Sequence, residues 1–293
     1  MFPQKSRYLI YFQYFGTKYS GVALTPCNQN TLGVQNYLEK AAEKLNPPAP
    51  IKFVISSRTD AGVHALCNTA HFDLERSDDA PPWDEEKLVQ GLNYHLKPEP
   101  IGVLGARRVP DSFHARFSAL SRTYVYRVVT GPSGHYQTPV FERDLCWATK
   151  RGHFNLEAMR EAASYLRGTH NFMTFCSSSS ELPFRNPVKH LARLEIRPAS
   201  GFLMDHHPGS ALKFWELEFT SGSFLYKQVR RMVGALVAVG QGHLQPYDVK
   251  KLLEVQDLMA SSHITVAPPG GLFLKDVEYC ESDLDIGPSE AEG

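Results

Sequence analysis

The sequence lacks the features that mark disulfide-bonded, metal-binding and membrane-spanning proteins. Its five cysteines are scattered and odd in number, and none forms a Cys-x-x-Cys pair, which argues against a disulfide framework and a structural zinc site. No run of about 18 apolar residues occurs, so no membrane-spanning helix is expected. Glycine-rich phosphate-binding motifs of the Gly-x-Gly-x-x-Gly and Gly-x-x-x-x-Gly-Lys-Ser/Thr types are also absent. We therefore expect no metal and no cofactor.

The composition is that of an ordinary folded protein. The chain has 293 residues, of which 42% are hydrophobic and 21% charged, enough for one large or two small cores. The scattered cysteines fit a reducing compartment. The strand-like run that begins at Arg7 leaves too few residues before it for a signal peptide or a transit peptide.

The formal net charge of zero hides an uneven distribution. Residues 281–293 hold five acidic and no basic residues, so we predict a disordered acidic tail there. The rest of the chain has 31 basic and 26 acidic residues, a net charge of +5. Such an excess is compatible with binding nucleic acid, although most proteins with this balance bind none.

Hydrophobic periodicity predicts strands and helices in a regular order. In the first half we expect strands at 7–14, 52–56, 68–74 and 101–107, with helices starting at Thr31 and after Asp84. This strand-helix-strand-strand-helix-strand order is that of a ferredoxin-like unit. A looser repeat follows, with strands at 120–129, 189–197, 212–219 and 271–279 and helices at 155–166, from 223 and from 247.

The predicted fold class is therefore α+β, with two ferredoxin-like (RRM-like) halves. Mainly antiparallel sheets and flanking helices are expected, and an active-site cleft between the halves. We place the halves at 1–110 and 111–280, because Val109-Pro110-Asp111 interrupts the pattern, and the acidic tail at 281–293.

Residues 55–65 form a short loop that carries Arg58-Thr-Asp60 among small residues. Asp60 is expected on a connection between two strands, where Gly62 supplies the turn. From these residues alone an ordinary polar turn is favoured, with Asp60 accepting backbone hydrogen bonds and Arg58 as its surface partner.

Six segments in order resemble the motifs of the TruA-type tRNA pseudouridine synthase family. They are residues 14–21, 57–65, 113–119 with 122–124, 168–172, 224–234 and 267–272, and they span nearly the whole chain. Residues 55–60, 139–143 and 224–232 resemble an animal subgroup of that family. The resemblance implies that the protein isomerises uridine to its carbon-glycoside isomer in RNA, with no redox change and no cofactor.

By the same resemblance, Asp60 is the catalytic carboxylate. It can add to an electrophilic carbon or remove the ribose C2′ proton, and the sequence leaves both paths open. For either path Asp60 must be ionised in a site that excludes water, which calls for a cationic neighbour. The resemblance assigns that role to Arg230, whose planar guanidinium can orient a carboxylate. It assigns stacking on the flipped target base to Tyr124.

Two further basic residues are candidate substrate contacts. Arg58 is our candidate for filling the space of the flipped nucleotide or holding its phosphate. A helix capped by residues 221–223 would place Lys227 and Arg230 on one face, which makes Lys227 a candidate as well. Arg231 is interpreted as solvated or phosphate-facing. The motif histidines His64, His114 and His170 are expected to be structural, hydrogen-bonded residues.

The resemblance implies RNA as the partner, with tRNA favoured, and no membrane. Many family members are homodimers and others are not, and no feature of the sequence decides the oligomeric state. The animal subgroup implies a mitochondrial location, with the cytoplasm as the alternative. Ser57, Asn171 and Val22-Ala23 depart from the common family pattern, so the choice of nucleotides stays open.

Three functions from different classes are compared. The first is a pseudouridine synthase that uses Asp60, Tyr124 and Arg230 together. The second is a catalytically inactive RNA-binding protein on the same fold, which the loss of one of these residues would favour; all three are present. The third is an unrelated hydrolase with Asp60 as nucleophile, but no paired acid, catalytic triad order or metal cluster accompanies it.

Overall fold

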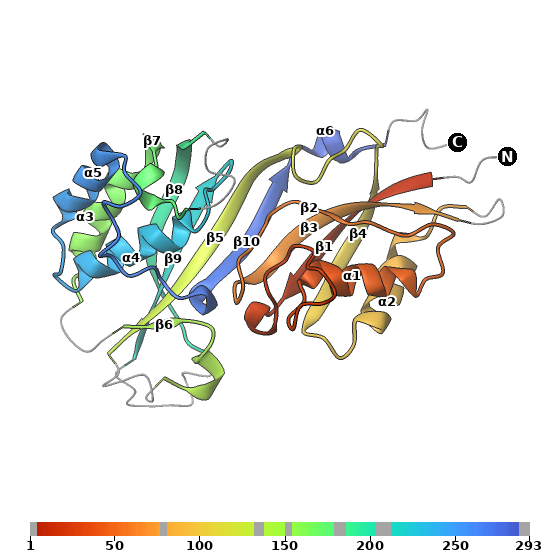
Figure 1. Cartoon of the computed structure of the whole chain (residues 1–293), viewed down its shortest axis with the longest axis horizontal. Helices are drawn as coiled ribbons and strands as arrows, with labels where there is room; N and C mark the ends of the chain where they lie inside the picture. The colour runs from red at the N-terminus through yellow and green to blue at the C-terminus, as the bar shows by residue number, and fades with distance from the viewer. Residues whose placement is uncertain are drawn as a thin grey trace. The chain divides into compact units, whose positions relative to one another are not determined.

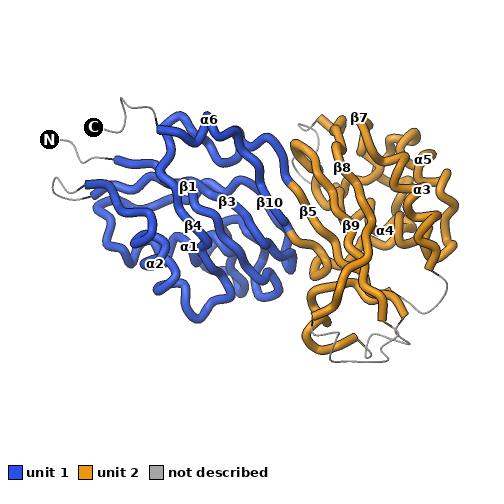
Figure 2. The backbone as a smooth tube through the Cα atoms, turned by 180° about the vertical axis from the view of Figure 1, so that it is seen from behind, with its two compact units in different colours: residues 1–122, 274–293 blue, residues 123–273 orange. Residues whose placement is uncertain are grey.

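The computed structural model describes residues 5–76, 81–131, 138–149, 154–178, 186–202 and 212–286 (Figure 1). Its contacts divide the chain into two compact units, which Figure 2 shows in blue and orange. Unit 1 comprises residues 1–122 and 274–293, and unit 2 comprises residues 123–273. The chain enters unit 2 within β5 (Ala119–Thr130) and returns to unit 1 within β10 (Leu272–Tyr279). Each unit is described by itself below.

Unit 1 has the predicted ferredoxin-like order of elements. Its sheet places β1 between β4 and β3, antiparallel to both, and β2 and β10 both neighbour β3. The elements are β1 (Lys5–Tyr14), the 3-10 helix η1 (Gly16–Lys18), α1 (Val34–Glu43), β2 (Val54–Ile55), β3 (His64–Glu75), α2 (Glu85–Leu96) and β4 (Ile101–Val109). The cap predicted at Asp84 is confirmed, because its carboxylate accepts a hydrogen bond from Lys87 N at 2.9 Å.

The two faces of the unit 1 sheet bury different partners. Tyr8 stacks on Phe72 of β3 and donates its hydroxyl to Trp83 O at the start of α2, so this face is the one that α1 and α2 cover. Residues alternate along a strand, so Leu9 and Tyr11 point to the opposite face. We call this opposite face the second face, and the loop that follows β4 packs onto it.

The boundary expected at 110 differs from the observed one. Phe113 and Ala115 form a buried cluster with Leu9 and Val109 on the second face of the unit 1 sheet, so the chain stays with unit 1 as far as Arg122. The isolated break at Pro110 misled the prediction, because these hydrophobic contacts are between residues far apart in the sequence.

The prediction of a disordered tail is wrong for residues 281–286. Helix α6 (Glu281–Leu284) buries Leu284 to 3% exposure in the same cluster. Arg107 holds Glu281 at 2.9 Å and Asp285 at 2.5 Å, which offsets the repulsion between the acids. The remainder of the expected tail, 287–293, lies outside the described residues.

A rigid turn at residues 113–118 crosses the second face near β3. Ala115 N donates to His71 Nδ1 at 3.0 Å, and the Tyr279 hydroxyl of β10 donates to Ala115 O at 2.6 Å. Tyr279 also shares a hydrogen bond with Thr69 Oγ1 at 2.6 Å. Two strands of the sheet therefore fix this turn through side chains.

We predict that the hold of His71 on this turn makes stability depend on pH. Burial, and then the charges of Arg7 and His114, lower the pKa of His71 from 6.5 to about 4, while Asp73 raises it slightly. Between pH 4 and pH 6.5, His71 is protonated in the unfolded chain and neutral in the folded chain. The free energy of unfolding that is present above pH 6.5 therefore falls as the pH drops towards 4. The loss is about 3 kcal/mol. Urea unfolding of the parent and of His71→Asn at several pH values tests this, and equal slopes in this window would contradict it.

Unit 2 places its strands in the order β5-β9-β8-β7, with β6 parallel to β5 and the β9–β8 and β8–β7 pairs antiparallel. Helices α3, α4 and α5 pack against one another, and α3 also contacts β8. The elements are the 3-10 helix η3 (Val140–Glu142), β6 (Trp147–Ala148), α3 (Leu156–Leu166), β7 (Gly168–Asn171), η4 (Met173–Phe175), β8 (Val188–Ala199), β9 (Lys213–Ser221), α4 (Gln228–Gly240), α5 (Pro246–Val255) and η7 (Pro269–Gly271).

A buried ion pair stabilises the interior of unit 2. Glu142, in the 139–143 segment, has a fully buried side chain, and Arg127 of β5 donates to its two oxygens at 2.6 and 3.1 Å. Phe202 N also donates to Glu142, so the carboxylate has three donors. A buried charge held this completely is costly to leave unpaired.

The α+β class with mainly antiparallel strands is confirmed in the described residues. Within those residues, no helix is long and apolar enough to cross a membrane. The cleft expected between the two halves stays a prediction.

Candidate active site

Asp60 lies where it was predicted, on the connection between β2 and β3 in unit 1. Its backbone forms an isolated antiparallel bridge with Gly21, and Asp60 O accepts a hydrogen bond from Val63 N at 3.1 Å. Thr59 O accepts another from Val22 N at 3.3 Å. The loop is therefore paired at Thr59 and Asp60 with the segment that follows β1.

Two glycines of the 14–21 segment allow this close approach. A Cβ added at Gly16 would lie 1.9 Å from Val63 O, and one added at Gly21 would lie 2.6 Å from Thr59 O. Gly21 also has a φ of +113°, which other residues rarely adopt. The first two motifs of the family resemblance are thus a single packed structure.

Side chains of β1 and β3 also form hydrogen bonds with the same loop. The Tyr14 hydroxyl shares a 2.7 Å hydrogen bond with Thr59 Oγ1, and Asn68 Nδ2 donates to Ser57 O at 3.0 Å. Burial raises the pKa of Tyr14 to about 12, so its phenol stays neutral at physiological pH. His64 Nδ1 accepts the Gly16 N–H at 3.0 Å, which confirms that His64 is a structural histidine.

His114 and His170 are also hydrogen-bonded as predicted. His114 Nδ1 accepts the N–H groups of Arg116 and Phe117 at 3.2 and 3.3 Å. His170 Nε2 lies 2.7 Å from Arg167 O. Each ring is therefore within hydrogen-bonding distance of backbone atoms two or three residues away in the sequence.

The residues around Thr59 differ in their exposure. Thr59 is buried, whereas Asp60 is half-buried and Arg58 is exposed. The inward threonine anchors the loop, and the two residues expected to meet RNA stand on either side of it. The structure brings Arg58 and Asp60 together on this one loop.

Arg122 joins a third motif to the loop. Its guanidinium donates to Arg116 O at 2.7 Å and approaches Ser56 Oγ and Ser57 Oγ at 3.4 Å each. The strand before Asp60 is therefore tied to the turn at 113–118. The sequence did not indicate this role, because Ser56 and Ser57 are more than 60 residues from Arg122 and come near it only in the folded chain.

The predicted base-stacking residue lies on β5 in unit 2. Tyr124 is 8% exposed, and its ring meets Phe224 edge-to-face with centroids 5.3 Å apart. Tyr126, two residues further along the same face, donates its hydroxyl to Pro268 O at 2.8 Å. Both tyrosines thus pack against motif segments of unit 2.

Arg230 lies on α4 and is fixed by Ala267. Arg230 Nε donates to Ala267 O at 2.7 Å, and Ala267 N donates to Arg230 O at 3.1 Å. The neighbouring carbonyl, of Pro268, is the one that accepts from Tyr126. Burial raises the pKa of Tyr126 well above its usual value, and the positive charge of Arg230 partly offsets that rise. Arg230 therefore lies close to the tyrosine face of β5.

Lys227 does not share a helix face with Arg230. Helix α4 begins at Gln228, and Lys227 precedes it in the left-handed conformation, with φ of 57°. Its ammonium group lies 4.9 Å from the centroid of the Tyr226 ring. The prediction that Lys227 lies on the Arg230 face is wrong, because the helix starts later than 223.

The expected cap and the second arginine are also corrected. The Ser221 hydroxyl donates to His190 O and Ser223 O instead of capping α4. Arg231 donates to Ser177 Oγ and Ser261 Oγ at 2.9 Å each, so it holds internal loops. The interpretation of Arg231 as solvated or phosphate-facing is therefore wrong.

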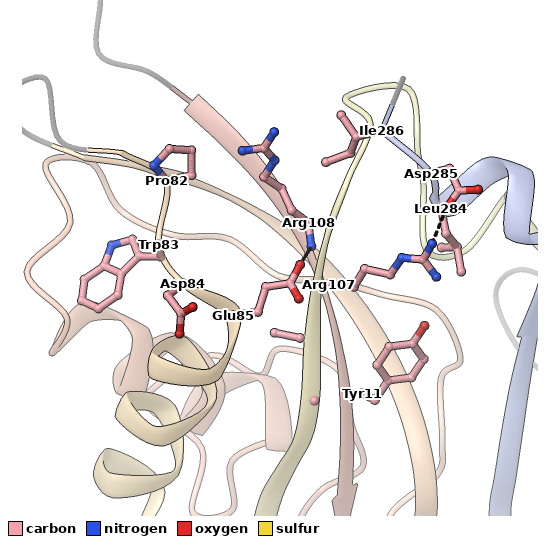
Figure 3. A pocket seen from close by; sticks show the side chains of 12 residues that line it. Tyr11, Pro82, Trp83, Asp84, Glu85, Arg107, Arg108, Leu284, Asp285 and Ile286 are labelled. Atoms are coloured by element: carbon pink, nitrogen blue, oxygen red, sulfur yellow. Dashed lines mark hydrogen bonds and ion pairs between the residues drawn. The ribbon is translucent and has the colours of Figure 1, made fainter. Parts of the chain in front are cut away.

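A pocket of about 880 Å³ in unit 1 lies apart from the predicted site residues (Figure 3). Three carboxylates and two guanidinium groups line it, and Figure 3 shows Arg107 directed at Asp285 and Glu85 beside Arg108. Because the acids outnumber the bases, this pocket does not suit a phosphate backbone. In the described part of the chain, no three His, Cys, Asp or Glu side chains gather in a group that could hold a metal ion.

A family model described as tRNA pseudouridine synthase matches residues 10–118 and 162–280. The chain belongs to the TruA-type tRNA pseudouridine synthase family. The matched ranges include Arg58, Asp60, Lys227 and Arg230, while Tyr124 lies between them. This result confirms the family resemblance drawn from the six motifs.

Named relatives of the tRNA pseudouridine synthase family cover almost the whole chain. The tRNA pseudouridine synthase-like 1 of Xenopus laevis is 57% identical over 285 residues, which cover 97% of this chain and 95% of the relative. The human protein of the same name is 51% identical over 276 residues, with 94% and 90% coverage. The tRNA pseudouridine synthase A of Roseobacter denitrificans is 38% identical over 261 residues, with 88% and 89% coverage. The resemblance to the animal subgroup is thereby confirmed.

Within this tRNA pseudouridine synthase, the candidate catalytic groups come from two units. Arg58 and Asp60 belong to unit 1, and Tyr124, Lys227 and Arg230 belong to unit 2. The approach of Arg230 and Tyr124 to Asp60 stays a prediction.

Proposed function

We propose that this protein isomerises uridine to pseudouridine in tRNA, with Asp60 as the catalytic carboxylate. Family membership supports the reaction, and the names of the relatives support tRNA as the substrate. The observation that carries the assignment of Asp60 is the set of contacts that hold its loop in place. The aspartate stands on a loop held by backbone pairing with Gly21, by Tyr14 and by Asn68, whereas an incidental polar turn needs no such support.

The reaction leaves the atomic composition of the nucleotide unchanged. The bond from C1′ to N1 of the base breaks, the base rotates, and a bond from C1′ to C5 forms. The C5 proton leaves and N1 gains a proton. Asp60 adds to C1′ or removes the C2′ proton as the glycosidic bond breaks, and an ionised carboxylate is needed for both paths.

The other site residues have supporting roles in this proposal. Tyr124 stacks on the base once it leaves the helix, and Arg230 orients the Asp60 carboxylate. Arg230 suits that role because Ala267 accepts its Nε–H, which fixes the plane of the guanidinium. Arg58 and Lys227 are proposed RNA contacts.

Release of tritium from RNA labelled at uridine C5 tests the proposal. The pure protein is incubated with unmodified tRNA carrying that label, and we expect tritium in the solvent because the C5 proton must leave. A catalytically inactive RNA-binding protein would bind the tRNA and release none. Failure with every RNA tried would therefore favour that alternative.

We predict that Arg230→Lys slows isomerisation far more than it weakens RNA binding. Lysine keeps the charge but has no planar fork and cannot donate the Nε hydrogen bond to Ala267. The rate at saturating RNA should fall by roughly 10- to 100-fold. Single-turnover tritium release and filter binding measure the two effects.

Arg231→Lys is the matched control for this experiment. Arg231 is the next residue on α4, and its guanidinium holds Ser177 and Ser261. Its replacement should lower the unfolding midpoint and leave the rate at saturating RNA close to that of the parent. If Arg230→Lys instead weakened RNA binding and left that rate unchanged, Arg230 would be a phosphate contact.

Location and assembly are further parts of the proposal. The resemblance to the animal subgroup is the basis for proposing a mitochondrial location, which cell fractionation with an antibody against the protein would test against the cytoplasm. A homodimer is proposed because many family members are homodimers. Sedimentation of the pure protein measures its oligomeric state.

A further inference from the structure

The turn at residues 113–118 in unit 1 presents an aromatic ring to solvent. Phe117 is 76% exposed, although Phe113 in the same turn is 2% exposed. Single exposed apolar residues are common on protein surfaces, so exposure alone assigns nothing. The inference depends on the contacts that hold this ring and on the charged residue beside it.

The ring of Phe117 is held before any ligand arrives. It lies on the imidazole of His114, with centroids 4.3 Å apart and planes tilted by 32°. The His114 ring is itself fixed, because its Nδ1 accepts the N–H groups of Arg116 and Phe117 and its carbonyl accepts the N–H of Ser118 at 2.8 Å. Burial is the main cause of a lowered pKa for His114, which favours the neutral acceptor form. A ring held in this way loses little freedom on binding.

A positive charge accompanies the ring. The guanidinium of Arg116 lies 5.7 Å from the centroid of the Phe117 ring. A flat apolar ring beside a guanidinium matches the two parts of a nucleotide, because the base can stack on the ring while the phosphate meets the charge. An apolar protein surface would match the ring and not the charge.

The turn is joined to the loop that carries Asp60. Arg122 donates to Arg116 O and approaches Ser56 Oγ and Ser57 Oγ, and Ser57 directly precedes Arg58. The aromatic turn and the catalytic loop therefore belong to one hydrogen-bonded part of unit 1.

We propose that Phe117, together with Arg116, is a stacking platform for a nucleotide that flanks the target uridine. The platform positions the RNA strand and does not touch the reacting atoms. This inference rests on the proposed function and adds a residue that selects which uridine is placed at Asp60. Sequence tolerance is expected, because every base offers a flat face to an aromatic ring.

Three substitutions of Phe117 test the platform against a simple packing role. Phe117→Ala removes the ring, Phe117→Leu keeps apolar bulk without a flat face, and Phe117→Trp enlarges the flat face. Filter binding with unmodified tRNA should show dissociation constants raised roughly tenfold for the Ala and Leu variants and close to the parent for Trp. Tyr94→Ala is the matched control, since Tyr94 is 72% exposed on α2 and its ring also contacts a histidine, His95, at 5.0 Å. The control should bind as the parent does.

Kinetics separate positioning of the strand from chemistry. A contact made equally in the bound RNA and in the transition state changes kcat/KM and leaves kcat unaltered. We therefore expect single-turnover tritium release by Phe117→Ala to match the parent at saturating tRNA and to fall about tenfold below saturation. The melting temperature should match that of the parent because the ring is exposed.

Several results would overturn the platform. If Phe117→Leu bound tRNA as tightly as the parent, Phe117 would act through apolar contact and not through stacking. Unchanged binding by Phe117→Ala would exclude any role of Phe117 in RNA recognition. A change in sedimentation without a change in tRNA affinity would make the ring an interface between copies of this chain. Absence of tritium release from the parent would contradict the proposed function instead, and the binding comparison would still decide the platform.

Discussion

Asp60→Asn should abolish uridine isomerisation and leave RNA binding within about twofold of the parent. The amide has nearly the shape of the carboxylate, but it can neither add to C1′ nor take up the C2′ proton. We expect the rate of tritium release to fall by roughly four orders of magnitude or more, as for other nucleophiles and bases.

The structure explains why this substitution should be local. The loop is held by the Gly21 bridge, by the Tyr14 contact with Thr59 and by Asn68, none of which uses the Asp60 carboxylate. Circular dichroism and the melting temperature of the variant should therefore match those of the parent.

Asp84→Asn is the matched control for the chemistry. Asp84 caps α2 in the same unit, and asparagine is as good a cap as aspartate. This variant should release tritium at the parental rate. Equal release from Asp60→Asn and the parent would remove Asp60 from the mechanism.

Glu142→Ala should destabilise unit 2 by about 3–5 kcal/mol, because it leaves the guanidinium of Arg127 without its buried partner. Unfolding by urea can be followed in a Trp83→Phe background. The remaining tryptophans, Trp147 and Trp215, both lie in unit 2 and so report on that unit.

Two further variants decide the cause of this loss. Glu157 forms an exposed ion pair with Arg160, and the Glu157 side chain is 82% exposed. Glu157→Ala should therefore lower the free energy of unfolding by less than about 1 kcal/mol. Replacement of both Arg127 and Glu142 by methionine should cost less than Glu142→Ala alone, since no charge is then left unpaired. If the double replacement cost more, packing would dominate over the unpaired charge.

The secondary structure was largely readable from the sequence because local rules decide it. Asp84 caps a helix through its own carboxylate, and the branched and aromatic residues of β1 and β5 form strands with runs of consecutive buried residues. The start of α4 was missed because a lysine gives no sign that it will adopt a left-handed conformation. The place of Leu284 was missed because its partner Leu9 lies at the other end of the chain.

The candidate site residues Asp60, Tyr124 and Arg230 came from the family resemblance and not from local rules. Their catalytic roles stay predictions, while the structure describes their immediate surroundings. The residues that hold them were not found, because Arg122 and Asn68 act on backbone and hydroxyl groups that only the folded chain brings near. The motif names the candidate reactive group, and long-range folding supplies the contacts that support its loop.

The return of β10 to unit 1 affects how the protein is made. Tyr279 bridges Thr69 and Ala115, and Leu284 completes the cluster around Leu9, so unit 1 needs residues from both ends of the chain. On the ribosome these last residues emerge only after unit 2 has been synthesised. The part of the protein that carries Asp60 is therefore completed last, and an unfinished chain lacks the Tyr279 hydrogen bond that helps to fix the 113–118 turn.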